Sequence, residues 1–173
     1  MNSSDSLIRF DIVKVNGNRV WPYFAPHHYL TGSFAGHHAF LAVLPDGEPV
    51  AFTSIVSFPH GRIKHGWRGH RTVVLPDFQG LGIGPRLSDW LGEYVLSIKG
   101  GRFFSKTSHP RLGAYREASP YWRATSSNRK VPTVKGVQAQ ANNFGWVADT
   151  TRLTFSHEYI GRQPDISQER KDT

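Results

Sequence analysis

Apolar positions in the first third of the chain follow the pattern of β-strands. Residues 8–15 alternate apolar and polar side chains, as a half-buried strand does. Two apolar runs, residues 39–44 and 49–58, are separated by the turn sequence Pro45-Asp46-Gly47 and predict a β-hairpin. The sequence Asn16-Gly17-Asn18 predicts a further turn directly after the first strand.

The apolar period changes to that of a helix after Pro85. Leu87, Leu91 and Val95 recur at helical spacing, and Gly100-Gly101 is suited to end the helix. Strands and short segments are expected on either side of it. We expect an exposed loop over residues 60–69, strands over 70–75, 102–107, 146–148 and 152–159, a short helix over 110–118, and an extended loop over 119–140.

Length and composition favour one globular domain. The chain has 173 residues, 38% hydrophobic and 20% charged, and we expect residues 1–161 to form the domain and 162–173 a disordered tail. No apolar run approaches the roughly 20 residues that span a bilayer, so a membrane protein is excluded. The first residues lack the pattern of a signal peptide. The absence of cysteine excludes disulfides, and a cytoplasmic location is expected.

The segment before the helix carries the clearest chemical signal. Gly80, Gly82 and Gly84 stand between the strand at residues 70–75 and the helix. Glycines accept positive φ and allow a ligand close to the backbone, so that successive N–H groups can face one concavity. The N-terminus of the following helix adds partial positive charge. This arrangement predicts a phosphate-binding loop.

Two common phosphate-binding loops do not fit these glycines. A Walker loop requires Gly-Lys followed by Ser or Thr, whereas Gly84 precedes Pro85-Arg86. A dinucleotide fingerprint requires three glycines at a different spacing near the start of a βαβ unit. The loop therefore belongs to another class.

The spacing Gln-x-x-Gly-x-Gly, at Gln79, Gly82 and Gly84, resembles the acyl-CoA signature of the GNAT acetyltransferase superfamily. The preceding Val-Val-Leu-Pro-Asp-Phe, residues 73–78, is similar to the usual lead-in of that family. The resemblance implies a mixed α/β fold, the GNAT fold, with a twisted mixed β-sheet flanked by helices. It also implies that the strand before the loop splays from its neighbour to admit the pantetheine arm. Residues 119–143 are the least family-like part.

The same resemblance implies acetyl-CoA, or a similar acyl-CoA, as cosubstrate. The backbone N–H groups of residues 79–84 would hold the pyrophosphate, and the preceding strand would lie along the pantetheine. Arg86 either adds charge to the loop or is a solvated arginine on the helix. The cofactor-binding residues expected are Val73, Val74, Leu75, Gln79, Gly80, Leu81, Gly82, Ile83, Gly84 and Arg86.

Acyl transfer to an amine needs a deprotonated nucleophile and a proton donor for the departing thiolate. In many GNAT enzymes a tyrosine or serine on the helix after the fifth strand is that donor, and Tyr115 lies on the corresponding helix here. Ser108 and His109, at the end of the preceding strand, are further candidates. Tyr115 could instead be a core aromatic residue with its hydroxyl at the surface. Since cysteine is absent, we expect direct attack in a ternary complex rather than a thioacyl-enzyme.

The chain contains nine histidines, including the pairs His27-His28 and His37-His38. Adjacent histidines in a strand point to opposite faces, so we expect no metal site. The early helix and loop of GNAT domains line the acceptor cleft, which makes His28 and Tyr29 candidate catalytic residues. A histidine there can act as a general base near neutral pH.

The net charge of +8 suggests an anionic partner, with nucleic acid as the first candidate, although a solvated basic surface gives the same total. Cations and aromatic residues are interleaved in the second half of the chain, and such a region can neutralise phosphates and stack on bases. The residues concerned are Lys106, Arg111, Tyr115, Arg116, Tyr121, Trp122, Arg123, Arg129, Lys130 and Lys135.

A looser resemblance is to phage-encoded Mom-type proteins, which are GNAT-like and modify adenine in DNA. It is carried by His28-Tyr29 and by the sequence Tyr-Arg-Glu-Ala-Ser-Pro-Tyr-Trp at residues 115–122. The glycine loop departs from it and follows the ordinary acetyltransferase pattern. Three hypotheses therefore stand: an acyl-CoA-dependent N-acyltransferase, a Mom-like DNA-modification enzyme, and a non-catalytic nucleic-acid-binding module. The acceptor, the acyl group and the oligomeric state are left open.

Overall fold

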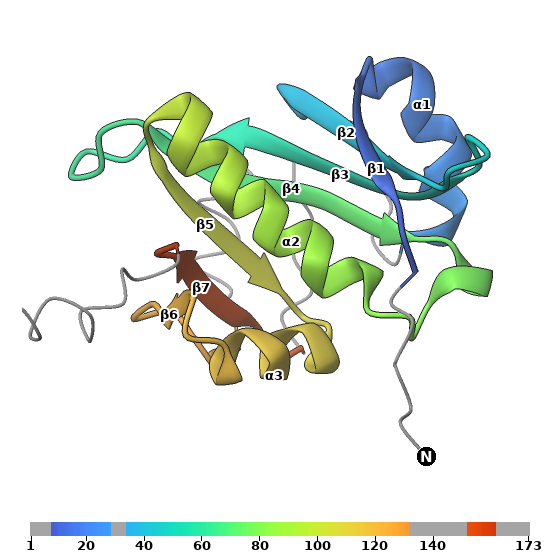
Figure 1. The fold of residues 1–173 in the computed structure, drawn as a ribbon. Helices are drawn as coiled ribbons and strands as arrows, with labels where there is room; N and C mark the ends of the chain where they lie inside the picture. The colour runs from blue at the N-terminus through green and yellow to red at the C-terminus, as the bar shows by residue number, and fades with distance from the viewer. Residues whose placement is uncertain (1–7, 29–33, 132–151, 162–173) are drawn as a thin grey trace, which may run out of the picture.

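The computed structural model describes residues 8–28, 34–131 and 152–161, which form a twisted β-sheet with helices on both faces (Figure 1). The strands follow the order β1-β2-β3-β4-β5-β7-β6 in a seven-stranded sheet. The strand bounds are β1 (Asp11–Val15), β2 (His38–Val43), β3 (Pro49–Ser57), β4 (Gly66–Val74), β5 (Arg102–Thr107), β6 (Trp122–Ala124) and β7 (Phe155–Tyr159).

Alternate side chains of β4 show how the helices divide between the two faces. Trp21 and Phe24 pack with Val73 on one face, whereas Leu87 packs with Val74 on the other. The face that carries α1 is thus opposite the face that carries α2, and α3 lies beside α2 (Figure 1). The helices are α1 (Gly17–Phe24), η1 (Ala25–His27), η2 (Pro76–Phe78), α2 (Ile83–Tyr94), η3 (Val95–Lys99) and α3 (Pro110–Ala118).

Strands β4 and β5 run parallel and are paired over a short distance, whereas the other neighbouring strands are antiparallel. Their pairing ends at Arg68 and Phe104, although both strands continue. Just beyond this point, β4 contains a bulge that leaves His70 without a partner residue on β3. A bulge increases local twist and bends a strand. The splay expected of the strand before the glycine loop is therefore present.

Several expected elements are confirmed. The β2–β3 hairpin forms around residues 45–47, and β5 and α3 have the expected bounds. Gly100 ends the long helix in the left-handed conformation, with φ of 61°. The twisted mixed sheet flanked by helices is the expected fold class. None of the helices within residues 8–28, 34–131 and 152–161 combines the length and apolar character needed to cross a bilayer.

Three expectations were wrong. Asn16-Gly17-Asn18 does not form a separate turn but starts α1, where the Asn16 side chain accepts a hydrogen bond from the Arg19 N–H at 3.3 Å. The loop expected over residues 60–69 ends earlier, because β4 begins at Gly66. The segment expected as an extended loop contains β6, which pairs with β7. The strand expected over 146–148 and the tail over 162–173 lie outside the described residues.

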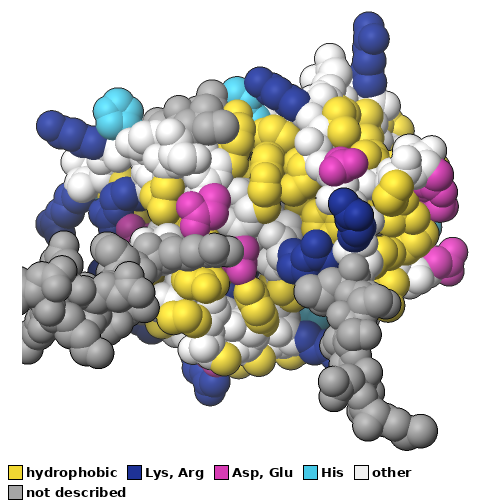
Figure 2. Space-filling model, in the orientation of Figure 1, with side chains coloured by type: hydrophobic (Ala, Val, Ile, Leu, Met, Phe, Trp, Pro, Cys, Tyr) yellow, Lys and Arg dark blue, Asp and Glu magenta, His cyan; other side chains and the backbone are white. Residues whose placement is uncertain are grey.

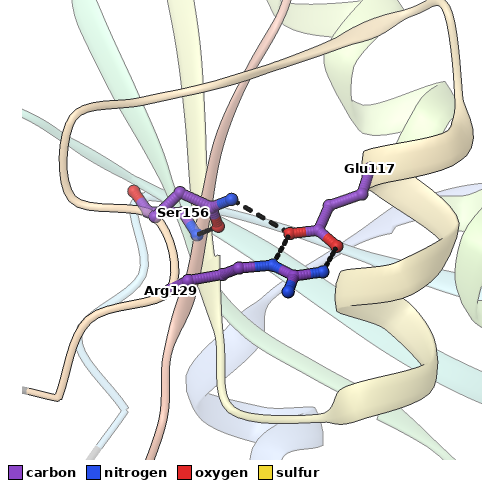
Figure 3. Close-up of polar contacts among 4 residues, drawn as sticks. Glu117, Arg129 and Ser156 are labelled. Carbon is purple, nitrogen blue, oxygen red and sulfur yellow. Dashed lines mark hydrogen bonds and ion pairs between the residues drawn. The ribbon is translucent and has the colours of Figure 1, made fainter.

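An ion pair ties α3 to the segment after β6 (Figure 3). Glu117 accepts two hydrogen bonds from the Arg129 guanidinium, at 2.8 and 2.6 Å, and one from the Asn128 amide at 3.0 Å. The Asn128 side chain also accepts from the Ser156 N–H of β7 at 2.8 Å. These bonds fix the residues that follow β6 against both α3 and the sheet.

Candidate functional site

The loop between β4 and α2 has the backbone expected of an anion cradle. Gly80 and Gly82 have φ of 85° and 73°, the left-handed region that glycine enters most readily. A Cβ atom added at either position would meet no atom within 4 Å, so the space beside both residues is open. Gly82 is the N-cap of α2, and the first N–H groups of a helix have no partner within the helix. Unpartnered donors and the helix dipole together favour an anion here.

Gln79 holds this loop against the strand that precedes it. Its side-chain amide donates to the Val74 carbonyl oxygen at 3.0 Å. The backbone N–H of Gln79 makes a second hydrogen bond, to the Pro76 carbonyl oxygen at 3.2 Å, which closes the turn of η2. The glutamine of the glycine signature thus has a structural task in this chain, and its backbone N–H is already engaged.

The end of β4 presents backbone rather than side chains to the opening beside β5. Val73 and Leu75 are buried against α1, and Val74 packs beneath α2. The Leu75 N–H donates to Val50 of β3 at 2.9 Å, so the N–H of Val74 points to the opposite edge of the strand. That edge faces the side on which β5 has parted from β4. An extended, amide-containing ligand arm could add hydrogen bonds there.

The other residues expected at the cofactor site differ in placement. Leu81 is half exposed on the loop, and Ile83, the first residue of α2, is buried. Arg86 is turned toward the N-terminal strand, where it donates to the Ile8 carbonyl oxygen at 2.6 Å and lies 4.4 Å above the Phe10 ring. In this position the guanidinium fixes the segment before β1.

Tyr115 is placed between α3 and α2. Its hydroxyl donates a short hydrogen bond to the carboxylate of Asp89, and the other carboxylate oxygen accepts from the Trp122 indole N–H at 2.7 Å. Burial and the Asp89 carboxylate raise the pKa of Tyr115 to about 12. The phenol is therefore protonated at neutral pH, and its hydroxyl is positioned by a residue of the same helix that opens at the glycine loop.

His109 and Ser108 follow β5 directly. His109 is the N-cap of α3, and its ring Nδ1 accepts a hydrogen bond from the Leu112 N–H at 3.4 Å. The backbone N–H of His109 donates to the Thr107 hydroxyl at 3.0 Å. Its ring thus helps to start α3. Ser108 is partly buried at the junction between the strand and this helix.

His28 lies on the α1 face of the sheet. Its ring contacts that of Trp21 edge-on, with centroids 5.6 Å apart. Tyr29, the second residue of the expected pair, lies outside the described residues. The structure therefore places His28 on the face opposite α2 and leaves the pair as a sequence-based expectation.

Asp89 was not among the residues expected from the sequence. It lies on α2, 26 positions before Tyr115, and nothing in the local pattern of apolar residues connects the two. A carboxylate on the flank of a helix is ordinarily a solvated residue. A search of the polar positions on α2 for partners on α3 would have been needed to find it.

The family and fold comparisons agree with this geometry. The model of the acetyltransferase (GNAT) family matches residues 14–117. The ribosomal-protein-S18-alanine N-acetyltransferase from Escherichia coli superposes with a TM-score of 0.59 at 13% identity, covering 91% of this chain and 98% of that chain. A chimera of the spermidine N-acetyltransferase SpeG from Vibrio cholerae and hSSAT superposes with a TM-score of 0.63 at 8% identity, covering 87% and 94%. Comparison with the curated proteins gave no match.

At these identities the superpositions show the fold, and the family model carries the assignment. The matched residues run from β1 through the glycine loop and α2 to most of α3. They include both Asp89 and Tyr115. The chain therefore belongs to the GNAT acetyltransferase family.

Proposed function

We propose that this protein transfers an acetyl group from acetyl-CoA to an amine by direct attack within a ternary complex. The observation that carries the proposal is the open loop at Gly80 and Gly82, which lies at the N-terminus of α2 beside strands that part from each other. The E. coli and V. cholerae proteins named above are N-acetyltransferases, which supports an amine as the acceptor.

In this proposal the residues of the loop bind the pyrophosphate of the cosubstrate. The N–H groups at the start of α2 and the left-handed turn at Gly80 and Gly82 supply donors, and the end of β4 supplies backbone groups for the pantetheine amides. Acetyl-CoA supplies a thioester, whose carbonyl carbon forms a bond to the amine nitrogen as its bond to sulfur breaks. The remaining chemistry is movement of protons, since the amine must lose one and the sulfur must gain one.

Tyr115 is the proposed donor to the departing sulfur. At neutral pH its hydroxyl is protonated, because its pKa is raised to about 12. A thiol has an ordinary pKa of about 8.5, so complete transfer from the phenol to a thiolate is unfavourable. Tyr115 would therefore act mainly through a hydrogen bond that stabilises the developing thiolate, with the thiol proton finally coming from solvent. The hydroxyl would turn from Asp89 to the sulfur to make this bond.

His28 is the proposed base for the amine. It lies on the α1 face, whereas the glycine loop opens α2 on the other face. A neutral histidine can take the proton that the nitrogen loses after attack. His109 and Ser108 are less suited, since the His109 ring already caps α3.

Calorimetric titration with acetyl-CoA tests the proposal. Gly82→Trp would fill the loop, and Gly47→Trp is a matched control, because Gly47 also has a left-handed φ and open space around it but lies in the β2–β3 turn. We expect the wild type and Gly47→Trp to bind with micromolar Kd and Gly82→Trp to bind at least about tenfold more weakly, a loss of about 1.4 kcal/mol. Absence of binding to folded wild type, or equal binding by all three proteins, would refute it.

A further inference from the structure

The face of β4 that carries α1 gathers positive charge beside the point where β4 and β5 part. Arg68 is the last residue of β4 that pairs with β5, and His70 and Arg71 follow in the bulge. Lys106 lies on β5, two positions after the last paired residue of that strand. We refer to Arg68, Arg71 and Lys106 as the cationic group; His70 lies beside them and is uncharged at neutral pH, because its pKa is lowered to about 4.

Contacts with aromatic rings place Arg71 and its neighbour His70 on the α1 face. The Arg71 guanidinium lies 5.6 Å from the centre of the Trp21 ring, which belongs to α1. The Nε2 atom of His70 accepts a hydrogen bond from the Ala35 N–H at 3.1 Å, and its ring is 5.6 Å from that of Phe34. These contacts face away from α2, so Arg71 and His70 lie on the face opposite the helix that begins at the glycine loop.

Arg68 and Lys106 extend this charge toward β5. The Arg68 guanidinium lies 5.5 Å from the centre of the Phe58 ring, and burial lowers its pKa. The pKa of Lys106 is lowered by partial burial of its ammonium group and by the charge of Arg68. The two cations therefore act on each other across the strands that part.

The charges that act on His70 are also positive. Its pKa is lowered to about 4, first by burial and then by the charges of Arg71, Arg68, His28 and His37. Among the described residues, each charge that acts noticeably on His70 or Lys106 is positive. An anion brought to this face would therefore gain favourable interactions with several cations at once.

We propose that the amine acceptor of this enzyme carries a phosphate group, which the cationic group binds while the amine reaches the thioester where β4 and β5 part. The inference rests on the proposed function, because it assigns the α1 face to the acceptor. Arginine presents a planar fork of donors that matches phosphate, and Lys106 adds a second point of charge.

A polyamine is disfavoured by the same argument. Spermidine carries several positive charges at neutral pH, and each would be repelled by the cationic group. A phosphate-bearing amine can be a free nucleotide or a base within a nucleic acid, since both offer an exocyclic amine and a phosphate. Both sources have the chemistry that the cationic group selects, and the experiment separates them.

The test is calorimetric titration of protein that has been saturated with CoA, so that the glycine loop is filled. The probes are dAMP, a single-stranded DNA 12-mer and spermidine. The variants are Arg71→Gln and Lys106→Gln, and Lys14→Gln on β1 is the matched control because it removes an exposed lysine at the far edge of the sheet. Lys106→Gln is the more secure variant, since Arg71 is buried and its replacement can affect folding.

We expect at least one phosphate probe to bind, with Lys106→Gln weakening it about tenfold or more, Lys14→Gln leaving it unchanged and spermidine not binding. Tight binding of dAMP identifies a free nucleotide, whereas binding of the 12-mer alone, with strong salt dependence, identifies nucleic acid. The proposal is overturned if spermidine binds more tightly than both phosphate probes, or if Lys106→Gln and Lys14→Gln have equal effects. Acetyl-CoA binding measured on the same proteins without added CoA shows separately whether the proposed function fails.

Discussion

The hydroxyl of Tyr115 on α3 donates a hydrogen bond to the carboxylate of Asp89 on α2. The same carboxylate accepts from the indole of Trp122, so three elements meet at one acceptor: α2, α3 and β6. Because α2 begins at the glycine loop, the helix that offers its N-terminus to an anion also positions the proposed hydrogen-bond donor to the sulfur. Figure 2 shows acidic side chains in scattered positions among apolar ones. Asp89 accepts from two uncharged donors, a phenol and an indole.

Replacing Asp89 tests how this carboxylate sets the state of Tyr115. Asp89→Asn keeps an oxygen that can accept one hydrogen bond but removes the negative charge. Burial is the main cause of the raised pKa of Tyr115, and Asp89 is the second. We expect the pKa to fall from about 12 but to stay above its ordinary value of about 10. Absorbance titration of tyrosine ionisation, with Tyr115→Phe subtracted, measures the shift.

The activity of Asp89→Asn adds a second readout. If Asp89 only supports folding, the variant will lose stability and keep its pH–rate profile after correction for the folded fraction. If Asp89 positions the donor, kcat falls more than KM changes, since the interaction of Tyr115 with sulfur strengthens in the transition state. An unchanged Tyr115 pKa would show that the carboxylate does not control the phenol.

Local sequence signals were sufficient for the elements that carry their own turn or cap chemistry. The hairpin around Gly47, the strand of residues 102–107 and the glycine loop were all predicted, because turn residues and apolar runs mark them directly. The start of α1 was not predicted. Asn16 is as good an N-cap as it is a turn residue, and the helix is decided by the burial of Trp21 and Phe24 against the sheet.

Contacts between distant segments could not be predicted in this way. Strand β6 is short, and it is a strand because β7, more than 30 positions away, pairs with it. The bond between Tyr115 and Asp89 and the cationic group on the α1 face likewise depend on how the strands and helices are placed in space. The sequence supplied the total positive charge, but the fold determines that part of it lies beside the diverging strands.

Two glycines on α2 provide a matched pair for testing packing. A Cβ atom at Gly92 would lie 2.3 Å from the ring of Tyr159, whereas one at Gly84 would lie 3.7 Å from Val74. We expect Gly92→Ala to lower the free energy of unfolding by about 1–3 kcal/mol, because the buried ring must shift. Gly84→Ala should be neutral or stabilise by up to about 1 kcal/mol through helix propensity. Urea unfolding measures both, and equal effects would contradict the close approach of α2 to β7.

Ser88 and Arg116 form a buried pair between α2 and α3. The Arg116 guanidinium donates to the Ser88 hydroxyl at 2.8 Å and lies 4.5 Å from the centre of the Trp122 ring. Burial lowers the pKa of Arg116 to about 10. Ser88→Ala removes an acceptor from a buried cation, so we expect a loss of about 1–3 kcal/mol in the free energy of unfolding.

A double-mutant cycle separates this bond from the packing around it. In an Arg116→Met background the cation is absent, and Ser88→Ala should then cost little, because alanine also has the higher helix propensity. Chemical unfolding of the four proteins gives the coupling free energy. A cost of Ser88→Ala that is the same in both backgrounds would show that the hydroxyl and the guanidinium do not stabilise each other.

The stability of the protein should fall in mild acid because of His70. Its pKa in the folded protein is about 4, below the ordinary value of 6.5. Between these two pH values the unfolded chain binds a proton that the folded protein does not, so the free energy of unfolding decreases as the pH falls through this window. A shift of this size corresponds to roughly 3 kcal/mol. The variant His70→Gln keeps an oxygen that can accept the Ala35 N–H but cannot titrate.

The comparison of wild type with His70→Gln isolates this contribution. At pH 7 the wild type should be the more stable protein, since the ring of His70 packs on Phe34. As the pH is lowered to 4, the difference in the free energy of unfolding should shrink by up to roughly 3 kcal/mol. Only the wild type has a histidine here that is protonated in the unfolded chain and must lose that proton on folding. His27→Gln, at an exposed position of η1, is the matched replacement of a histidine outside the sheet. A constant difference for His70→Gln would mean that His70 takes up a proton as readily in the folded protein as in the unfolded chain, and that the cationic group tolerates a further charge beside it.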